Sequence, residues 1–309
     1  MDTVTVLFDP FNLGHKSVHI IELSFQGIFH SSTNSEFIVC WCPKVYEVDE
    51  ETNEQTEIKG EIALLRGDVL QFHKILDDPY EVHVADNGNV CFWDNNILSV
   101  INILGQDLIK RRFDANISVL AISANGQYTV CNTAFSSGVD SISVFFFDNE
   151  LATLLWQVPR HSNLSLGYSF EIDTDRQFIF LVYVSMGRFR YAFDGEFIDS
   201  NEFHFAMIAH GYDIPKLIKE RIDNKNYYLS KEEIMRTKTE LLKAVDYQKE
   251  VRENPFELAW VYKALGFICE RQENLYEALD YFVEATKYHD RIGVNRRIAR
   301  IRKIIDDKQ

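Results

Sequence analysis

The stretch SANGQYTVC, residues 123–131, repeats with few changes a pattern that ADNGNVCFW sets at residues 85–93. In both stretches Asn-Gly, a pair that supplies positive φ in tight turns, leads into a run of β-branched and aromatic residues. Two further copies of a turn and a strand stand at residues 34–40, NSEFIVC, and 175–181, DRQFIFL. A turn that enters a strand at four places along one chain predicts a repeated β architecture.

Each copy has a shorter alternating run before its turn and two more strands after it. The preceding runs read SVHIIELS, YEVHVAD, ISVLAIS and YSFEIDT, and the later pairs read EIALLRGDVLQF, LSVINILGQDLI, ISVFFFDNELATLL and RFRYAFDGEFI. Gly67, Gly105, Asn149 and Gly195 stand at the turns of the later pairs, since Gly and Asn supply positive φ there. Each unit is therefore expected to be four antiparallel strands in about 40 to 50 residues.

This unit resembles the blade of a β-propeller of the WD40 and PQQ-enzyme kind, over residues 15–203. The resemblance implies about four four-stranded units. FWD at residues 92–94 departs from WD40 repeats, because it ends the second strand of its unit where WD40 repeats end the third. VTVLFD, near the start of the chain, is a candidate strand for closing a blade from the other end. An ordinary β-sandwich or meander is the alternative for the same strands.

The first unit carries an acidic insertion, YEVDEETNEQTEIKG, at residues 46–60. Little in it can be buried, so it predicts a solvated hairpin arm between the second and third strands. Two roles stay open for this arm: a passive loop, or a docking arm for a basic surface.

After about residue 204 the strand alternation stops and helix signals begin. Helices are expected to begin at Asp213, which is followed by Pro215, at the capping box Ser230–Glu233, and at Asn254, which Pro255 follows. About five helices are expected from Asp213 onward, in a short superhelical stack.

Residues 259–292 resemble a tetratricopeptide repeat (TPR), in which small residues let two helices approach closely. The matching positions are large, large, small, small, large and small, and are occupied by Tyr262, Leu265, Gly266, Ala278, Phe282 and Ala285. Cys269, where an aromatic residue is usual, and Asp290-Arg291, where a proline is usual, depart from the repeat.

The last helix is predicted to bury one face and to leave its cations on the others. The buried face consists of Val294, Ile298, Ile301 and Ile305. The remaining faces carry Arg296, Arg297, Arg300, Arg302 and Lys303. A solvated capping helix and a basic docking face are both open interpretations. Together the two halves predict an α+β protein, with an all-β propeller-like domain at residues 1–203 and a TPR-like helical domain at residues 204–309.

The amino-acid composition limits which kinds of partner and which cellular compartment are expected. The formal net charge of the 309 residues is −15. This charge argues against nucleic acid as a partner and is compatible with a protein that has a basic surface. The sequence shows no secretory leader and no apolar run long enough to cross a membrane, so we expect a cytoplasmic protein without membrane contact. The five cysteines contain no CxxC pair and are expected to be reduced core residues.

No catalytic motif stands out. His15 and His19, four residues apart, fall in a loop that enters a strand, where chelation is not expected. Cys40 and Cys42 share one strand face and are expected to pack in the core. Asp94, Asp148 and Asp194 each end a strand at a turn, which explains them without catalysis. No cofactor or metal is expected, and the protein is not expected to be an enzyme.

The sequence therefore predicts a non-enzymatic, protein-binding scaffold that presents a propeller-like surface and a helical groove. Two alternatives are an immunity or inhibitor protein that masks a basic toxin or nuclease, and a hydrolase that acts on a small molecule or glycan at a channel mouth. The candidate partner-binding residues lie on the helix at about 256–271 and are Trp260, Glu257, Lys263 and Arg271. Trp260 lies about 200° around this helix from Tyr262. It is expected either to be an exposed anchor or to pack on the preceding helix or on the β domain.

Overall fold

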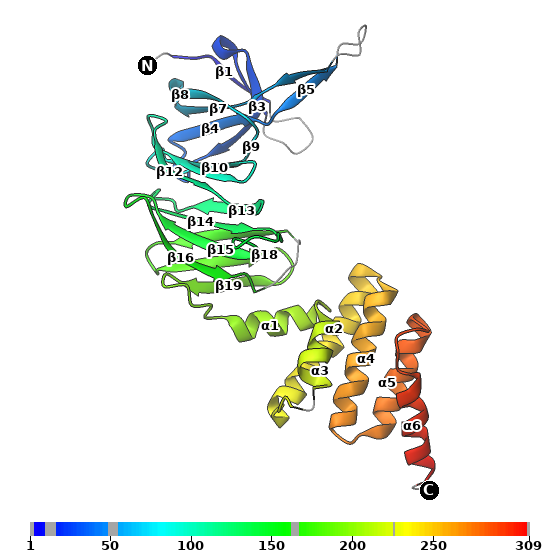
Figure 1. The fold of residues 1–309 in the computed structure, drawn as a ribbon. Helices are drawn as coiled ribbons and strands as arrows, with labels where there is room; N and C mark the ends of the chain where they lie inside the picture. Colours follow the sequence, from blue (N-terminus) through cyan, green and yellow to red (C-terminus); the bar gives the residue numbers. More distant parts are fainter. Residues whose placement is uncertain (1–2, 10–16, 49–54, 162–166, 225, 308–309) are drawn as a thin grey trace. The chain divides into compact units, whose positions relative to one another are not determined.

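The computed structural model describes residues 3–9, 17–48, 55–161, 167–224 and 226–307. The chain divides into two compact units, Met1–Ile198 and Asp199–Gln309, called here the β unit and the helical unit (Figure 1). The boundary expected at 203/204 falls inside the first helix, α1 (Ser200–Ala209), so it lies five residues earlier. The sequence did not predict α1, because the apolar residues of this helix are not confined to one face.

The first sheet of the β unit has six strands in the order β1-β2-β3-β4-β7-β8. Its strands are β1 (Val6–Asp9), β2 (Ser17–Ile20), β3 (Phe25–Ser31), β4 (Phe37–Cys42), β7 (Gly60–Arg66) and β8 (Val69–Leu76). A 3₁₀ turn, η1 (Ile21–Leu23), joins β2 to β3. The acidic insertion includes a separate hairpin of β5 (Val45–Val48) and β6 (Gln55–Ile58), which lies between β4 and β7 as expected.

Three further antiparallel sheets follow in chain order, from cyan to green in Figure 1. The second sheet contains β9 (Pro79–Val84), β10 (Val90–Asp94), β11 (Ile97–Ile101) and β12 (Asp107–Arg112). The third contains β13 (Ile117–Ile122), β14 (Tyr128–Thr133), β15 (Ser143–Asp148) and β16 (Thr153–Pro159). The fourth contains β17 (Tyr168–Asp173), β18 (Phe178–Tyr183) and β19 (Gly187–Ala192). The runs beginning NVCFW and YTVCN are both second strands, so the β unit is propeller-like.

Three details differ from the expected repeat. SVHIIELS does not supply the strand before the first turn, because it breaks at η1 and β3 takes that place. Within the described residues, the fourth sheet has three regular strands, and EFI is reduced to one bridge between Tyr191 and Phe197. In the turn at Asn149, the residue with positive φ is Ala152.

The N-terminal strand also differs from its expected role. β1 pairs with β2 of its own first sheet instead of closing a blade at the other end. Thr3 forms a bridge with Val69 of β8, at the opposite edge of the same sheet. Val4, between these contacts, is buried in a small core with Val18. The N-terminal segment therefore completes the first sheet.

The Asn-Gly turns explain why the repeat is visible in the sequence. Gly88 and Gly126 have φ of 82° and 76°, which side chains rarely adopt. A Cβ at Gly126 would lie 2.1 Å from Oδ1 of Asn87, in the equivalent turn of the preceding sheet. Glycine is therefore required both by the turn itself and by the close approach of two turns.

Hydrogen bonds link these turns from one sheet to the next. The amide of Asn34 donates to Oδ1 of Asp86 at 2.8 Å, and the amide of Asp86 donates to the carbonyl of Ala124 at 2.7 Å. Nδ2 of Asn89 donates to the carbonyl of Gly126 at 3.1 Å. Apolar clusters fill the space between the sheets; Val39 packs with Phe92 between the first and second, and Val100 with Phe145 between the second and third.

The helical unit continues from α1 through a series of helices. They are α2 (Ile214–Leu217) with the π-helical turn η2 (Ile218–Ile222), α3 (Lys231–Tyr247) with the π-helical turn η3 (Gln248–Arg252), α4 (Pro255–Arg271), α5 (Leu275–Tyr288) and α6 (Asn295–Asp306). The capping box of Ser230 and Glu233 and the Asn254 cap are both present, which confirms the expected helix starts.

The closest helix packing is between α4 and α5. The six positions that matched the repeat pattern are all buried. A Cβ at Gly266 would lie 2.6 Å from Cδ1 of Phe282, so this glycine permits the contact of α4 with α5. Ile298, Ile301 and Ile305 form the buried face of α6, as the sequence predicts.

Candidate functional site

The four candidate partner-binding residues lie along α4. Trp260 is partly buried against the core of the helical unit. The ammonium of Lys263 lies 4.3 Å from the centroid of the Trp260 ring and donates to the carbonyl of Ile292 at 2.7 Å. These two side chains therefore sit together, next to the segment that joins α5 to α6.

The other two candidates have local contacts at the ends of the helix. The amide of Glu257 donates to Oδ1 of the Asn254 cap at 3.2 Å, and its carboxylate pairs with Arg252 at 2.9 Å. The guanidinium of Arg271 donates to the carbonyls of Asn224 and Tyr227, at 2.7 and 3.2 Å. Arg271 thus holds the segment between η2 and α3, and the four residues do not form one cluster.

A small pocket of about 180 Å³ lies beside α4. It is called the α4 pocket and is lined by Ile222, Asp223, Phe267, Glu270, Arg271 and Arg297. Arg297, from α6, pairs with Asp223 at 2.7 Å and with Glu270 at 2.9 Å, and its guanidinium carbon lies 4.2 Å from the Phe267 ring centroid. Arg300 also pairs with Glu270. Of the predicted residues, only Arg271 lines this pocket.

The charges that line the α4 pocket are balanced. Burial, and then the neighbouring charge of Arg297, lowers the pKa of Lys263 from its usual value, although Asp223 opposes the effect. Two cations, Arg271 and Arg297, and two carboxylates, those of Asp223 and Glu270, line the pocket. The sequence pattern predicted Arg297 to be one of several exposed cations. It did not predict the contacts of Arg297 with Phe267 and Glu270.

A second candidate surface lies in the β unit, on the loop between β14 and β15. This 134–142 loop carries Phe135 and Val139, whose residues are 81% and 87% exposed. These two side chains are among the most exposed large apolar residues in the described part of the chain.

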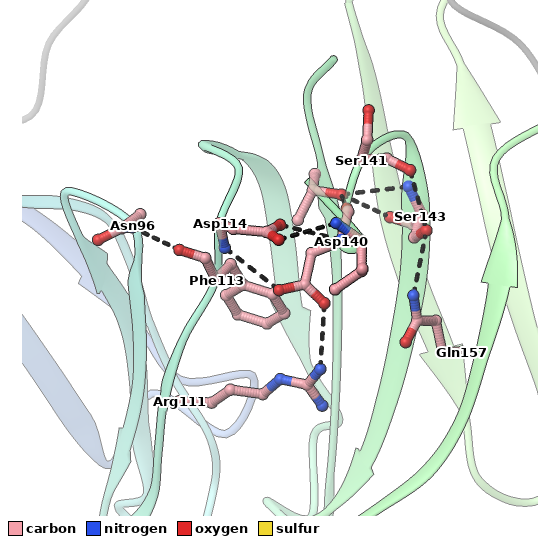
Figure 2. A network of polar contacts seen from close by, with 10 residues as sticks. Asn96, Arg111, Phe113, Asp114, Asp140, Ser141, Ser143 and Gln157 are labelled. Atoms are coloured by element: carbon pink, nitrogen blue, oxygen red, sulfur yellow. Dashed lines mark hydrogen bonds and ion pairs between the residues drawn. The ribbon is translucent and has the colours of Figure 1, made fainter. Parts of the chain in front are cut away.

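Two carboxylates hold the 134–142 loop in place, as Figure 2 shows. The side chain of Asp114 accepts the amides of Val139 and Asp140, at 2.8 and 2.9 Å. The buried carboxylate of Asp140 accepts the amide of Asp114 at 3.2 Å and the guanidinium of Arg111 at 3.3 Å. The carboxylates of Asp114 and Asp140 therefore each accept the backbone amide of the other residue. These bonds join the linker after β12 to the 134–142 loop.

Hydroxyl groups complete the order of the loop. The hydroxyl of Thr133 donates to the carbonyl of Asp140 and accepts the amide of Ser143 at 3.1 Å. The amide of Ser136 donates to the hydroxyl of Ser141 at 2.9 Å. Because these bonds fix the backbone, Phe135 and Val139 are presented on an ordered loop, which lowers the entropy that binding would cost.

No sequence motif singled out this loop. Its signal lies in AFSSGVDS, residues 134–141, where two apolar residues stand among small polar ones. The distant partner Asp114 could not be assigned from spacing, because it belongs to the linker before β13.

The other residues named from the sequence lie in ordinary structural positions. His15 lies outside the described residues, and His19 is an exposed residue of β2. Cys40 is buried in β4, where burial raises the pKa of its thiol to about 12. Within the described part of the chain, no group of three His, Cys, Asp or Glu side chains is arranged to hold a metal.

The three aspartates at strand ends have structural partners. Asp94 accepts the amides of Asp77 and Asp78, at 3.1 and 3.0 Å. Asp148 and Asp194 accept amides within their own turns. The interpretation that these residues belong to turns is confirmed.

The net charge is unevenly divided between the units. Residues 1–198 contain 12 Lys and Arg against 27 Asp and Glu, and residues 199–309 contain 20 of each. The β unit therefore carries the whole net charge of −15, and the helical unit is neutral. None of the helices in the described ranges is long and apolar enough to span a bilayer.

Comparison with known proteins gives similarities at the level of structure only. No family model and no curated protein matches the sequence. A crystal structure of a HIRA fragment is 12% identical, with 90% of this chain and 93% of that chain covered and a TM-score of 0.40. The WD40 domain of Neurospora crassa Pan2 is 8% identical with a TM-score of 0.37, over 62% of this chain and 54% of that one. A complex of KlAtg21 with the coiled coil of AgAtg16 is 12% identical with a TM-score of 0.39, over 62% and 63%.

Proposed function

We propose that the chain is a non-enzymatic scaffold that binds a protein partner through the 134–142 loop of its β unit. The observation that carries this proposal is the contrast within the loop: its backbone is fixed by Asp114 and Asp140, yet Phe135 and Val139 are almost fully exposed. Ordered aromatic and aliphatic side chains that become buried on association supply much of the affinity of protein interfaces.

The partner in this proposal has a basic surface around an apolar pocket. The β unit, with its net charge of −15, attracts such a surface and repels an acidic one. An inhibitor that masks a basic toxin or nuclease is a narrower form of the same proposal.

We also propose that the β unit is an open propeller of four blades and that the helical unit is a TPR-like stack. The first part is supported by the four consecutive sheets, whose last member lacks a regular fourth strand. The second part is supported by the burial of the six matched positions of α4 and α5 and by the close contact at Gly266. Both architectures present surfaces to other proteins.

The test is affinity capture from the native host with three forms of the full chain. One bait is unchanged, one carries Phe135→Ser with Val139→Ser, and the control carries Leu104→Ser with Leu151→Ser. The control leucines are 62% and 68% exposed and lie in turns between the third and fourth strands of their sheets, at the opposite strand ends from the loop.

We expect the first pair of substitutions to abolish capture of a partner that the control bait retains. Loss of the buried apolar area would cost about 3 kcal/mol, roughly a hundredfold in affinity. Capture of the same partner at equal levels by all three baits would exclude the loop as the binding surface.

A further inference from the structure

The last strand of the third sheet, β16, has one unpaired side. It pairs with β15, and within the described residues no segment pairs with its other side. The amide of Arg160, just after the strand, donates to the carbonyl of Ile142 at 2.8 Å, so by alternation the backbone of Gln157 faces outward. Pro159 has no N–H and ends the part that can pair with a further strand. The unpaired part is therefore residues 153–158, called here the β16 edge.

The β16 strand differs from the last strands of the first, second and fourth sheets in its charge. Charged side chains on an outer strand oppose pairing with another chain. Such residues are Lys74 in β8, Asp107, Lys110, Arg111 and Arg112 in β12, and Arg188 and Arg190 in β19. The sequence of β16, TLLWQVP, contains no charged residue, and Leu154 and Leu155 are 38% and 44% exposed. An exposed, uncharged and apolar edge favours the addition of a strand.

Exposed carboxylates lie beside the β16 edge. Glu150 is exposed in the turn that precedes the strand. Asp194 and Glu196, also exposed, flank Gly195 in the fourth sheet. A Cβ at Gly195 would lie 3.1 Å from Cδ2 of Trp156, so these two residues lie near the strand. None of the three carboxylates has an ion-pair partner among the described residues.

These charges distinguish between the possible occupants. The cation next to the strand is Arg160, whose guanidinium donates to the hydroxyl of Tyr168 at 3.0 Å. A second copy of the chain would bring the same three carboxylates to the contact, and its β unit would add a further net charge of −15. A strand with Lys or Arg at its ends has the complementary charge.

We infer that the β16 edge accepts an added strand from a partner protein, an extended segment with an uncharged centre and with Lys or Arg at its ends. Main-chain hydrogen bonds to the outward-facing backbone hold this segment, and its side chains cover Leu154 and Leu155. This inference rests on protein binding, the proposed function, and gives the β unit a second surface that uses no residue of the 134–142 loop.

The experiment measures fluorescence anisotropy of labelled ten-residue peptides with the full chain. The probe has alternate Val and Thr at its centre and two Lys at each end. A matched peptide has Glu in place of Lys, and a third carries N-methyl groups on its central residues, which removes their N–H donors and keeps their side chains. We expect the Lys-ended probe to bind about tenfold or more tightly than either of the other two.

Two variants locate the binding site. Leu155→Lys places a like charge on the β16 edge and should weaken binding of the Lys-ended probe about tenfold. Ile75→Lys makes the same change at a residue of β8 that is 65% exposed, and it should leave the affinity within about twofold. Melting temperatures of both variants check that the β unit is folded.

Equal binding of the N-methylated and unmethylated peptides, equal binding of the Lys-ended and Glu-ended peptides, or no peptide binding would overturn the inference. Equal effects of Leu155→Lys and Ile75→Lys would also overturn it. Dimerisation in analytical ultracentrifugation that Leu155→Lys abolishes, without peptide binding, would overturn it in favour of a second copy. None of these results affects capture through Phe135 and Val139, so the proposed function is tested separately.

Discussion

Neighbouring elements are joined differently in the two units. In the β unit, the sheets are linked at their ends by polar contacts: amides of one segment are accepted by Asp86, Asp94 or Asp140 of another. In the helical unit, α4 and α5 are joined by close apolar contact at Gly266. Polar contacts at strand ends leave the neighbouring loops free to vary in sequence, whereas a close helix contact does not tolerate larger side chains.

The largest effect is expected at the helix joint. Gly266→Leu should lower the free energy of unfolding of the helical unit by about 3 kcal/mol or more, because the new side chain must displace the Phe282 ring. Urea denaturation of the full chain, followed by circular dichroism at the helix band, measures it. Gly167→Leu is the control, since a Cβ there meets nothing within 4 Å. Equal midpoints for both variants would mean that α4 and α5 do not pack as described.

The next largest effect is expected at a polar joint of the β unit. Asp140→Ala should cost about 2–3 kcal/mol, because the amide of Asp114 and the partly buried guanidinium of Arg111 both lose their acceptor. Asp175→Ala, at an exposed residue of a turn, is the matched control and should change little. Thermal unfolding of the unchanged chain and the two variants at neutral pH measures this cost. Equal melting temperatures for all three proteins would mean that the Asp140 contacts do not stabilise the β unit.

Acid should weaken the helical unit through His204. Burial, with Arg221 and Lys216 close by, lowers the pKa of this imidazole to about 4. The unfolded chain binds its proton near pH 6.5, so the folded state loses stability as the pH falls from 6.5 to 4, by about 2 kcal/mol after partial exposure is allowed for. Unfolding free energies of the unchanged chain and of His204→Gln should converge across this window. Parallel pH profiles would contradict this prediction.

The smallest effect is expected at the start of α3. Ser230→Ala removes the hydroxyl that accepts the amide of Glu233 at 3.1 Å and should cost about 1 kcal/mol. Ser230→Asn, which keeps an acceptor, should cost much less. The difference in the free energy of unfolding between the two variants, measured by urea denaturation, gives the contribution of the cap. Equal free energies for the two variants would show that the cap does not stabilise α3.

Local signals predicted much of the fold. The Asn-Gly turns and the Ser230 capping box depend on neighbouring residues in the chain, and each was found where expected. The small residue Gly266 was also found at a close helix contact, with Phe282 of the next helix. The missed features depend on distant partners. The N-terminal segment is held in part by the bridge of Thr3 to Val69 in the distant strand β8, and helix α1 was missed because it has no one-sided apolar pattern.

The candidate surfaces were harder to predict for the same reason. Trp260 and Lys263 were named from helical spacing alone and do lie together on α4. Arg297 reaches Glu270 of α4 from α6, and Asp114 fixes the 134–142 loop from the linker before β13. Both depend on contacts between segments at least 25 residues apart in the chain, which spacing does not reveal.

Hydroxyl-radical footprinting of the full chain, free and with its captured partner, tests the central claim most directly. Phe135, at 81% exposure, reports on the 134–142 loop, while Leu104 and Leu151 report on the opposite strand ends within the same molecule. The account predicts that partner binding slows oxidation of Phe135 several-fold and leaves both leucines unchanged. Unchanged oxidation of Phe135, with slower oxidation of Leu104 and Leu151, would contradict it.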